Sequence, residues 1–286
     1  MNPEPSATVD SCGPPPPIRT RARLAAGLLA LSMSLLGLWM SIDLRRYGCE
    51  HAFHHDIDSP VLAVELASNA AELKSAIEPT CSDQPEASRL AAQHQAKSAL
   101  LRNTVADCFF IPLYTLFVWS FGSLFAVRAG GVRMRLRHML AGVTIGTALA
   151  DYVENVGIFR SLGLEPSDVL AQLTCWPSRC KWTLLATALW LTAVILFRSE
   201  HQMYSLPTRR LFGVGYVVSG ALLVAGLWRP VLIELALRLF AVIVVLQIFA
   251  LLGPYVADWI PADSPTYEED FCDRHKKQHV DLAVHE

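Results

Sequence analysis

Residues 138–159 read HMLAGVTIGTALADYVENVGIF, an apolar run that is interrupted near its end by Asp151, Glu154 and Asn155. A helix of about 22 residues rises ~33 Å, which is enough to cross the ~30 Å hydrocarbon core of a bilayer. Backbone inside lipid must satisfy its own hydrogen bonds, so a helix is the structure we expect. The run therefore predicts a membrane-spanning helix with ionisable side chains inside it.

Five further apolar runs flank this segment. They are residues 24–42, 108–127, 182–197, 211–228 and 230–257. Of the 286 residues, 52% are hydrophobic and 17% are charged, a balance typical of membrane proteins. We predict an all-α fold, a polytopic transmembrane helical bundle of about six spans. Spans 2–4 (residues 108–197) would form its core, and spans five and six (residues 211–257) a hairpin.

Basic residues cluster at alternate ends of the predicted spans. They are Arg19, Arg21 and Arg23 before the first span, Arg128, Arg133, Arg135 and Arg137 after the second, and Arg198, Arg209 and Arg210 after the fourth. Positively charged residues in short connections stay on the cytoplasmic side of a membrane. The pattern predicts a multi-pass protein of the cell (inner) membrane, with residues 1–23 and 258–286 as cytoplasmic tails.

The long segment of residues 43–107 is expected on the opposite, extracytoplasmic side. Ser59 and Pro60 are typical of a helix start. Apolar residues then follow at helical spacing, namely Leu62, Leu66, Leu73 and Ile77. A second amphipathic stretch, residues 85–106, runs toward the second span. We predict a small helical cap over the outer ends of the bundle.

The acidic residues of the third span share one helix face, because they stand at positions i, i+3 and i+4. An ionisable group inside a span costs on the order of 3 kcal/mol, so such groups usually face partners or water. Counted from the basic end, the cluster lies in the outer half of the membrane. Gly142, Gly146 and Ala150 repeat at four-residue spacing on the same helix, which predicts close approach of another span.

Polar residues of other spans lie at matching depth. The candidate ligand or proton site comprises Asp107, Tyr114, Asp151, Glu154, Asn155 and Lys181. Three interpretations are open: a site for a substrate or proton, an ion-pair network that fixes helix packing, and placement at the helix boundary without a special role.

Four cysteines fall on the predicted outer side, where disulfides persist. They are Cys49, Cys81, Cys175 and Cys180. We expect two disulfides, with Cys175 to Cys180 as one candidate pair; the alternative is free thiols or redox exchange. A quinone-linked thiol oxidase normally carries Cys-x-x-Cys, and the four-residue spacing between Cys175 and Cys180 departs from that pattern.

Three histidines, His51, His54 and His55, stand close to Asp56 and Asp58 and are weak candidates for metal ligands. Histidines of this kind are more often part of a flexible loop, so no metal or cofactor is predicted.

Soluble-enzyme motifs such as a Walker loop or a Gly-x-Ser-x-Gly turn do not occur. The formal net charge of -2 gives no reason to expect a nucleic-acid partner.

Glu234 and Arg238 stand four residues apart in the last span. They are expected to pair within their helix, which would hide both charges from lipid.

Several segments together resemble bacterial multi-pass inner-membrane proteins with a D-x-x-E-N motif in a transmembrane helix. They are Leu62-Ala-Val-Glu65-Leu-Ala67, Asp107-Cys-Phe-Phe-Ile-Pro-Leu-Tyr114, Asp151-Tyr-Val-Glu154-Asn155 and Lys181-Trp182. The resemblance covers about residues 24–197 and implies a four-span unit, which spans five and six exceed. It implies no activity.

The leading functional hypothesis is a membrane protein that binds or transports a small or lipidic molecule at an outer-leaflet polar pocket. One alternative is a membrane-embedded enzyme acting on a lipid, quinone or thiol, with the paired carboxylates as acid and base. Another is a structural or assembly protein with ion-paired helices, which an exposed apolar face on residues 62–77 would favour. The bilayer itself is the one partner that the sequence predicts outright.

Overall fold

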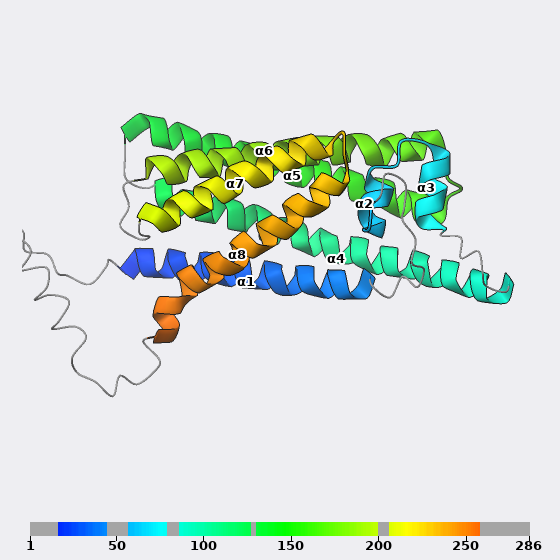
Figure 1. Ribbon diagram of the computed structural model, residues 1–286, viewed down its shortest axis with the longest axis horizontal. Helices are drawn as coiled ribbons and strands as arrows, with labels where there is room; N and C mark the ends of the chain where they lie inside the picture. The colour runs from blue at the N-terminus through cyan, green and yellow to red at the C-terminus, as the bar shows by residue number, and fades with distance from the viewer. Residues whose placement is uncertain (1–16, 45–56, 79–85, 127–129, 200–205, 258–286) are drawn as a thin grey trace, which may run out of the picture.

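The structure, a computed structural model, describes residues 17–44, 57–78, 86–126, 130–199 and 206–257, and every regular element in these ranges is an α-helix. The helices are α1 (Pro17–Leu44), α2 (Pro60–Glu65), α3 (Ala70–Ile77), α4 (Glu86–Ala126), α5 (Gly130–Gly163), α6 (Asp168–Arg198), α7 (Leu206–Gly226) and α8 (Val231–Ala257). The long helices run along the long axis of the molecule, and α2 and α3 lie together near one end (Figure 1). The predicted all-α class is confirmed.

Within the described residues, five helices are long and apolar enough to cross a membrane, namely α1, α4, α6, α7 and α8. The protein is therefore a multi-pass membrane protein, with one such helix fewer than the number predicted. The missing one is α5, the helix built around residues 138–159, because Asp151, Glu154 and Asn155 lower its mean hydropathy. It nevertheless packs between α4 and α6 inside the bundle.

The long helices form a closed ring in which α4, α5, α6, α7, α8 and α1 each pack against the next, and α1 returns to α4. Aromatic side chains fill much of the interior: the ring centroids of Phe121 and Tyr216 are 6.2 Å apart, and Tyr216 is equally far from Phe240. Large apolar side chains such as Leu149 and Phe249 instead face outward. An apolar exterior is the surface that a lipid-embedded bundle requires.

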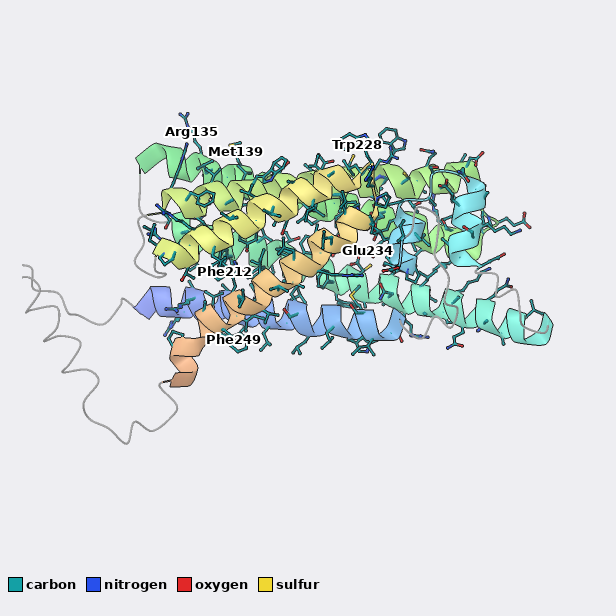
Figure 2. All side chains as sticks on the ribbon, in the orientation of Figure 1. Arg135, Met139, Phe212, Trp228, Glu234 and Phe249 are labelled. Carbon is teal, nitrogen blue, oxygen red and sulfur yellow. The ribbon has the colours of Figure 1, made fainter. Side chains whose placement is uncertain are left out.

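The first and last described helices meet at the end of the bundle away from α2 and α3 (Figure 1). Pro254 has no N–H and so leaves the carbonyl of Ala250 without its helical donor. The Nη2 atom of Arg23 donates to this carbonyl over 2.7 Å. The start of α1 and the end of α8 are thereby joined, and Arg135 at the start of α5 lies near the same end (Figure 2).

Helices α5 and α6 lie close together at Gly157, where an added Cβ would be 2.8 Å from Thr174 Cγ2 and 3.0 Å from the Leu173 carbonyl oxygen. The prediction of close packing at Gly142 and Gly146 is wrong. A Cβ at Gly142 would meet no atom within 4 Å, and one at Gly146 would make an ordinary contact of 3.4 Å. Spacing along one helix does not say which of its faces a neighbour covers.

The cap predicted from residues 59–77 is present, but as two short helices instead of one. Ser59 is the N-cap of α2 and Pro60 is its first residue, as predicted. The apolar side chains that define the pattern are all buried, namely Leu62, Leu66, Leu73 and Ile77. Helix α4 begins at Glu86 and runs without a break through the predicted second span.

The connection predicted at residues 160–181 is mostly helical. Helix α5 continues to Gly163 and α6 already begins at Asp168, with Ser167 as its N-cap. The first three turns of α6 therefore lie beside α2 and α3 rather than in a loop. This extension gives the cap a rigid helix to dock on.

Candidate functional site

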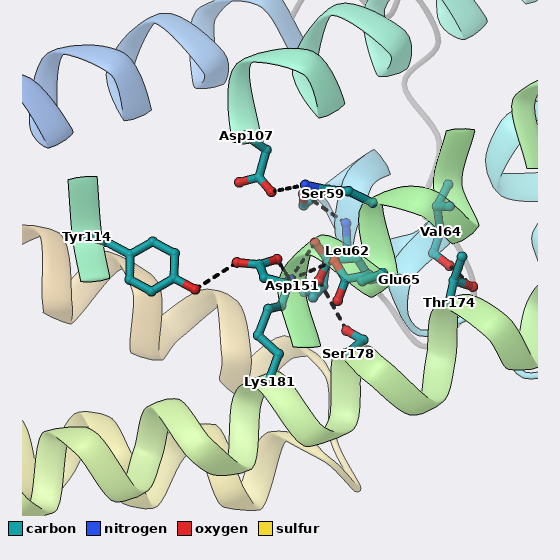
Figure 3. Close-up of polar contacts among 12 residues, drawn as sticks. Ser59, Leu62, Val64, Glu65, Asp107, Tyr114, Asp151, Thr174, Ser178 and Lys181 are labelled. Atoms are coloured by element: carbon teal, nitrogen blue, oxygen red, sulfur yellow. Dashed lines mark hydrogen bonds and ion pairs between the residues drawn. The ribbon is translucent and has the colours of Figure 1, made fainter. Parts of the chain in front are cut away.

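The centre of the site is the ammonium group of Lys181 on α6, a residue that is only 5% exposed. Its Nζ lies 2.7 Å from Glu154 Oε1, 3.1 Å from Asp151 Oδ1 and 3.1 Å from Glu65 Oε1. These carboxyl groups come from α5 and α2 and are themselves buried (Figure 3). We call Glu65, Asp151, Glu154 and Lys181 the Lys181 cluster.

Helix α4 adds a buried tyrosine to this cluster. The hydroxyl of Tyr114 donates to Asp151 Oδ2 over 2.9 Å (Figure 3). Beside it, Asn155 Nδ2 donates to Asp107 Oδ2 over 2.8 Å, which joins α5 to α4 a second time. Every residue of the predicted candidate site is thus found in one continuous region, although Asp107 and Asn155 form their own pair next to the Lys181 cluster.

Two residues of the site, Glu65 and Ser178, were not among the predicted candidates, although Glu65 stands in one of the segments that carry the resemblance. Glu65 reaches Lys181 from the cap, and its other oxygen, Oε2, accepts a hydrogen bond from Ser178 Oγ over 3.3 Å. The signal for Glu65 was present, because it is the single acidic residue in the apolar run of residues 61–67. Ser178 stands three residues before Lys181 and so shares its helix face.

Polar side chains of α6 hold the cap in place along the turns that precede Lys181. Thr174 Oγ1 donates to the carbonyl of Val64 over 3.3 Å, and Gln172 Nε2 donates to the carbonyl of Ser68 over 2.8 Å. These contacts join α6 to the end of α2 and to the connection between α2 and α3. Asp168 in turn accepts from the first N–H of α3.

The opposite end of α2 is fixed by α8. Glu234 Oε1 accepts from the backbone N–H groups of Asp58 and Ser59, over 2.9 and 2.8 Å. The predicted pair within α8 is confirmed, since Arg238 Nη2 lies 3.5 Å from Glu234 Oε2. Helix α2 is therefore held by carboxylate contacts at both ends, through Glu234 at its start and through Glu65 at its last residue.

Three buried polar atoms at the cluster have no hydrogen-bond partner within the described part of the chain. They are the acceptors Asp151 Oδ1 and Glu154 Oε2 and the donor Trp182 Nε1. The ring of Trp182 lies 4.5 Å from Lys181 Nζ, within the range of a cation–π interaction. Buried polar groups in proteins nearly always have a partner, so these atoms leave hydrogen-bonding capacity at the cluster that no described residue uses.

The formal charges of the cluster do not balance. One ammonium group faces three carboxyl groups, which leaves two negative charges without a counter-charge. Uncompensated charge in a low-dielectric interior costs several kcal/mol per group. The cluster therefore has a surplus of acidic groups, and such groups are suited to acid–base chemistry and to ion-coupled binding.

The aromatic and basic residues of α6 indicate how deep the Lys181 cluster would lie in a membrane, because such residues mark the two membrane–water interfaces. Exposed Trp176 stands toward the cap and Arg198 at the other end. About 22 residues separate them, a rise of ~33 Å that matches the hydrocarbon thickness of a bilayer. Lys181 lies five residues inside Trp176, or ~7.5 Å along the helix. Trp228, at the turn before α8, lies toward the same end (Figure 2).

A seam between α4 and α5 borders the site on the outer surface of the bundle. Pro112 leaves the carbonyl of Cys108 without its helical donor. The hydroxyl of Tyr152 donates to this oxygen over 3.1 Å. Tyr152 is 41% exposed, so this hydrogen bond lies at the exposed surface of the bundle.

The predicted disulfide between Cys175 and Cys180 is absent, and both are free cysteines. Five residues of α-helix separate them by ~7.5 Å, beyond the Cα separation that a disulfide can bridge. The other two candidates, Cys49 and Cys81, lie outside the described residues.

The histidines His51, His54 and His55 also lie outside the described residues. In the ranges that the structure describes, no group of three or more histidine, cysteine, aspartate or glutamate residues is arranged to hold a metal ion.

Comparison of the chain with protein-family models, with curated proteins and with solved structures gave no match. The resemblance to bacterial inner-membrane proteins with a D-x-x-E-N motif accordingly stays a prediction. Function has to be argued from the geometry of the Lys181 cluster.

Proposed function

We propose that this multi-pass membrane protein binds or transports a small or lipidic molecule at the Lys181 cluster. One observation carries the proposal. In this buried site three carboxyl groups face a single ammonium group, and polar atoms beside them have no hydrogen-bond partner among the described residues. A cluster that served packing alone would be expected to balance its charges, because an unbalanced one destabilises the fold.

The residues have distinct roles in this proposal. Glu154 is the group that takes up a proton or binds a cation, since its Oε2 is free to accept a hydrogen bond from a bound molecule. Lys181 is its counter-charge, and Tyr114 orients Asp151 through the hydrogen bond to Oδ2. Asn155 holds Asp107 beside the cluster.

The same proposal includes an orientation in the membrane. The arginines of α1, α5, α6 and α7 that the sequence analysis singled out lie toward the end opposite the cap, near the first described residues of the chain (Figures 1 and 2). By the positive-inside rule this end faces the cytoplasm. The cap and the Lys181 cluster then belong to the outer half of the cell (inner) membrane.

A second candidate function is structural, a clamp that joins the cap to the bundle. The observation in its favour is that the ammonium of Lys181 has three N–H donors and lies within 3.1 Å of carboxyl groups from both α2 and α5. Such a clamp would fix packing without a ligand.

Native mass spectrometry of the purified protein, combined with thermal unfolding, separates the two candidates. We expect wild-type protein in mild detergent to retain a non-covalent mass that Glu154→Gln loses while its Tm stays within about 3 °C. Glu78→Gln, which removes a partly exposed ion pair with Lys97 in the cap, is the matched control and should keep the bound mass. If Glu154→Gln abolishes folded protein and no bound mass is seen in the wild type, the clamp is the correct function.

A further inference from the structure

The Lys181 cluster has the chemistry of an ammonium-binding site. A primary ammonium group has three N–H donors. Lys181 Nζ donates a charge-assisted hydrogen bond to Glu154 Oε1 over 2.7 Å, and it forms ion pairs with Glu65 Oε1 and Asp151 Oδ1, each at 3.1 Å. The ring of Trp182, 4.5 Å away, adds the aromatic surface that favours organic cations.

Two further observations indicate that this site is built for more than its own lysine. Its carboxyl groups outnumber the single ammonium group, so it attracts additional positive charge. In addition, Asp151 Oδ1 and Glu154 Oε2 are buried acceptors without a hydrogen-bond partner within the described residues, and their side chains are only 4% and 0% exposed. Both oxygens lack a donor, and an ammonium ligand, which has N–H donors and no acceptor, would supply it.

We propose that the Lys181 cluster recognises the primary ammonium group of an aliphatic amine, and that Lys181 is the built-in occupant with which this ligand competes. The assignment rests on the proposed function and gives its ligand a chemical class. The hydrogen bond of 2.7 Å to Glu154 Oε1 requires an N–H donor, so a quaternary ammonium, which has none, is a poor substitute.

Competition by amines in the wild-type protein is the first test. Purified protein is unfolded thermally in detergent with ethylammonium, 1-propylammonium, tetramethylammonium or potassium, all as chlorides at equal pH and ionic strength. The primary amines are expected to raise Tm by several degrees in a saturable manner, whereas tetramethylammonium and potassium are not. Glu154→Gln should abolish the response, and Glu78→Gln should keep it. Equal shifts with all four salts, or none with any, overturn the proposal.

Shortening the side chain at position 181 provides the second test. Lys181→Ala removes the atoms from Cγ to Nζ, which correspond to a 1-propylammonium ion. This ion should raise the Tm of Lys181→Ala by at least about 5 °C, while 1-propanol and propionate should not. Lys181→Met retains a long side chain in the same space and should show no such rescue. Equal effects of 1-propanol and 1-propylammonium on Lys181→Ala contradict an ammonium site.

The two proposals fail in different ways. A non-covalent mass that depends on Glu154, together with no response to any primary amine, overturns the ammonium assignment and leaves the proposed function standing. Where the wild type carries no bound mass and amines have no effect, both are overturned.

Discussion

Lys181 Nζ lies 3.1 Å from Glu65 Oε1, although Glu65 ends a six-residue helix outside the apolar spans and Lys181 lies within one of them. This ion pair joins the cap to the bundle at the level of the candidate site. Any movement of α2 away from α6 would separate the two charges. The pair therefore couples the position of the cap to the charge balance of the cluster.

Loosening of the cap can be detected with native cysteines. Cys175 is 3% exposed and lies beneath the cap, with its Sγ 3.9 Å from the Leu66 carbonyl, whereas Cys180 on the same helix is exposed. Glu65→Gln should speed the reaction of Cys175 with a water-soluble maleimide, because it removes the charge that holds the end of α2. The rate at Cys180 should stay the same.

This measurement uses proteins in which the remaining cysteines are replaced by serine and only Cys175 or Cys180 is kept. Glu78→Gln is again the matched control, since its ion pair with Lys97 lies at the edge of the cap. An unchanged rate at Cys175 in Glu65→Gln would show that the apolar contacts of Leu62 and Leu73 hold the cap without the ion pair.

Removal of the central ammonium should be the most destabilising change at the site. Lys181→Met leaves three buried carboxyl groups without a counter-charge, and breaking a buried ion pair costs about 3–5 kcal/mol. The double variant Lys181→Met/Glu154→Gln should recover part of this loss, because it removes one of the repelling charges. The free energy of unfolding from reversible detergent titration measures both. Additive losses would mean that the two residues do not interact.

The close contact of α5 with α6 predicts opposite effects for two glycines of α5. Gly157→Ala places a methyl group 2.8 Å from Thr174 Cγ2 and should destabilise the protein by about 1–3 kcal/mol. Gly142→Ala meets no atom within 4 Å and should stabilise the helix by about 0.5–1 kcal/mol. Unfolding titrations of the two variants check this, and similar values for both would contradict the packing at Gly157.

The contribution of the hydrogen bond between the Tyr152 hydroxyl and the Cys108 carbonyl to stability can be tested by a conservative substitution. Tyr152→Phe leaves that carbonyl without a donor next to Pro112, and a lost hydrogen bond of this kind costs about 1 kcal/mol. Thr183→Val, which removes an exposed hydroxyl bonded within its own helix, is the control and should have a smaller effect. A loss equal to that of the control would mean that the oxygen finds another donor.

The thiols of α6 should both react with iodoacetamide in denatured protein prepared without reductant. Cys175 and Cys180 are free, and the helix holds their Cα atoms too far apart for a disulfide. Peptide mass spectrometry after alkylation should find each modified once. A cross-linked peptide that contains both residues would contradict the continuous helix.

The apolar run lengths predicted the helices well, because a lipid-embedded backbone has few alternatives to a helix. The helix limits were less predictable. The apolar runs end at Phe159 and resume at Trp182, which left residues 160–181 as a connection. In the structure α6 already begins at Asp168, and the cap supplies partners for its polar side chains. Tertiary contacts outweighed the local signal there.

Sequence alone determined the membrane class, the start of α2 at Ser59 and the presence of Asp151, Glu154 and Asn155 on one helix face, because each follows from run length, capping chemistry or helical spacing. Only the tertiary structure decided that Glu65 completes the site and that Gly157, rather than Gly142, lies at the helix contact. Both depend on how α2, α5 and α6 are positioned relative to one another. Periodicity within one helix contains no information about which neighbour lies against each of its faces.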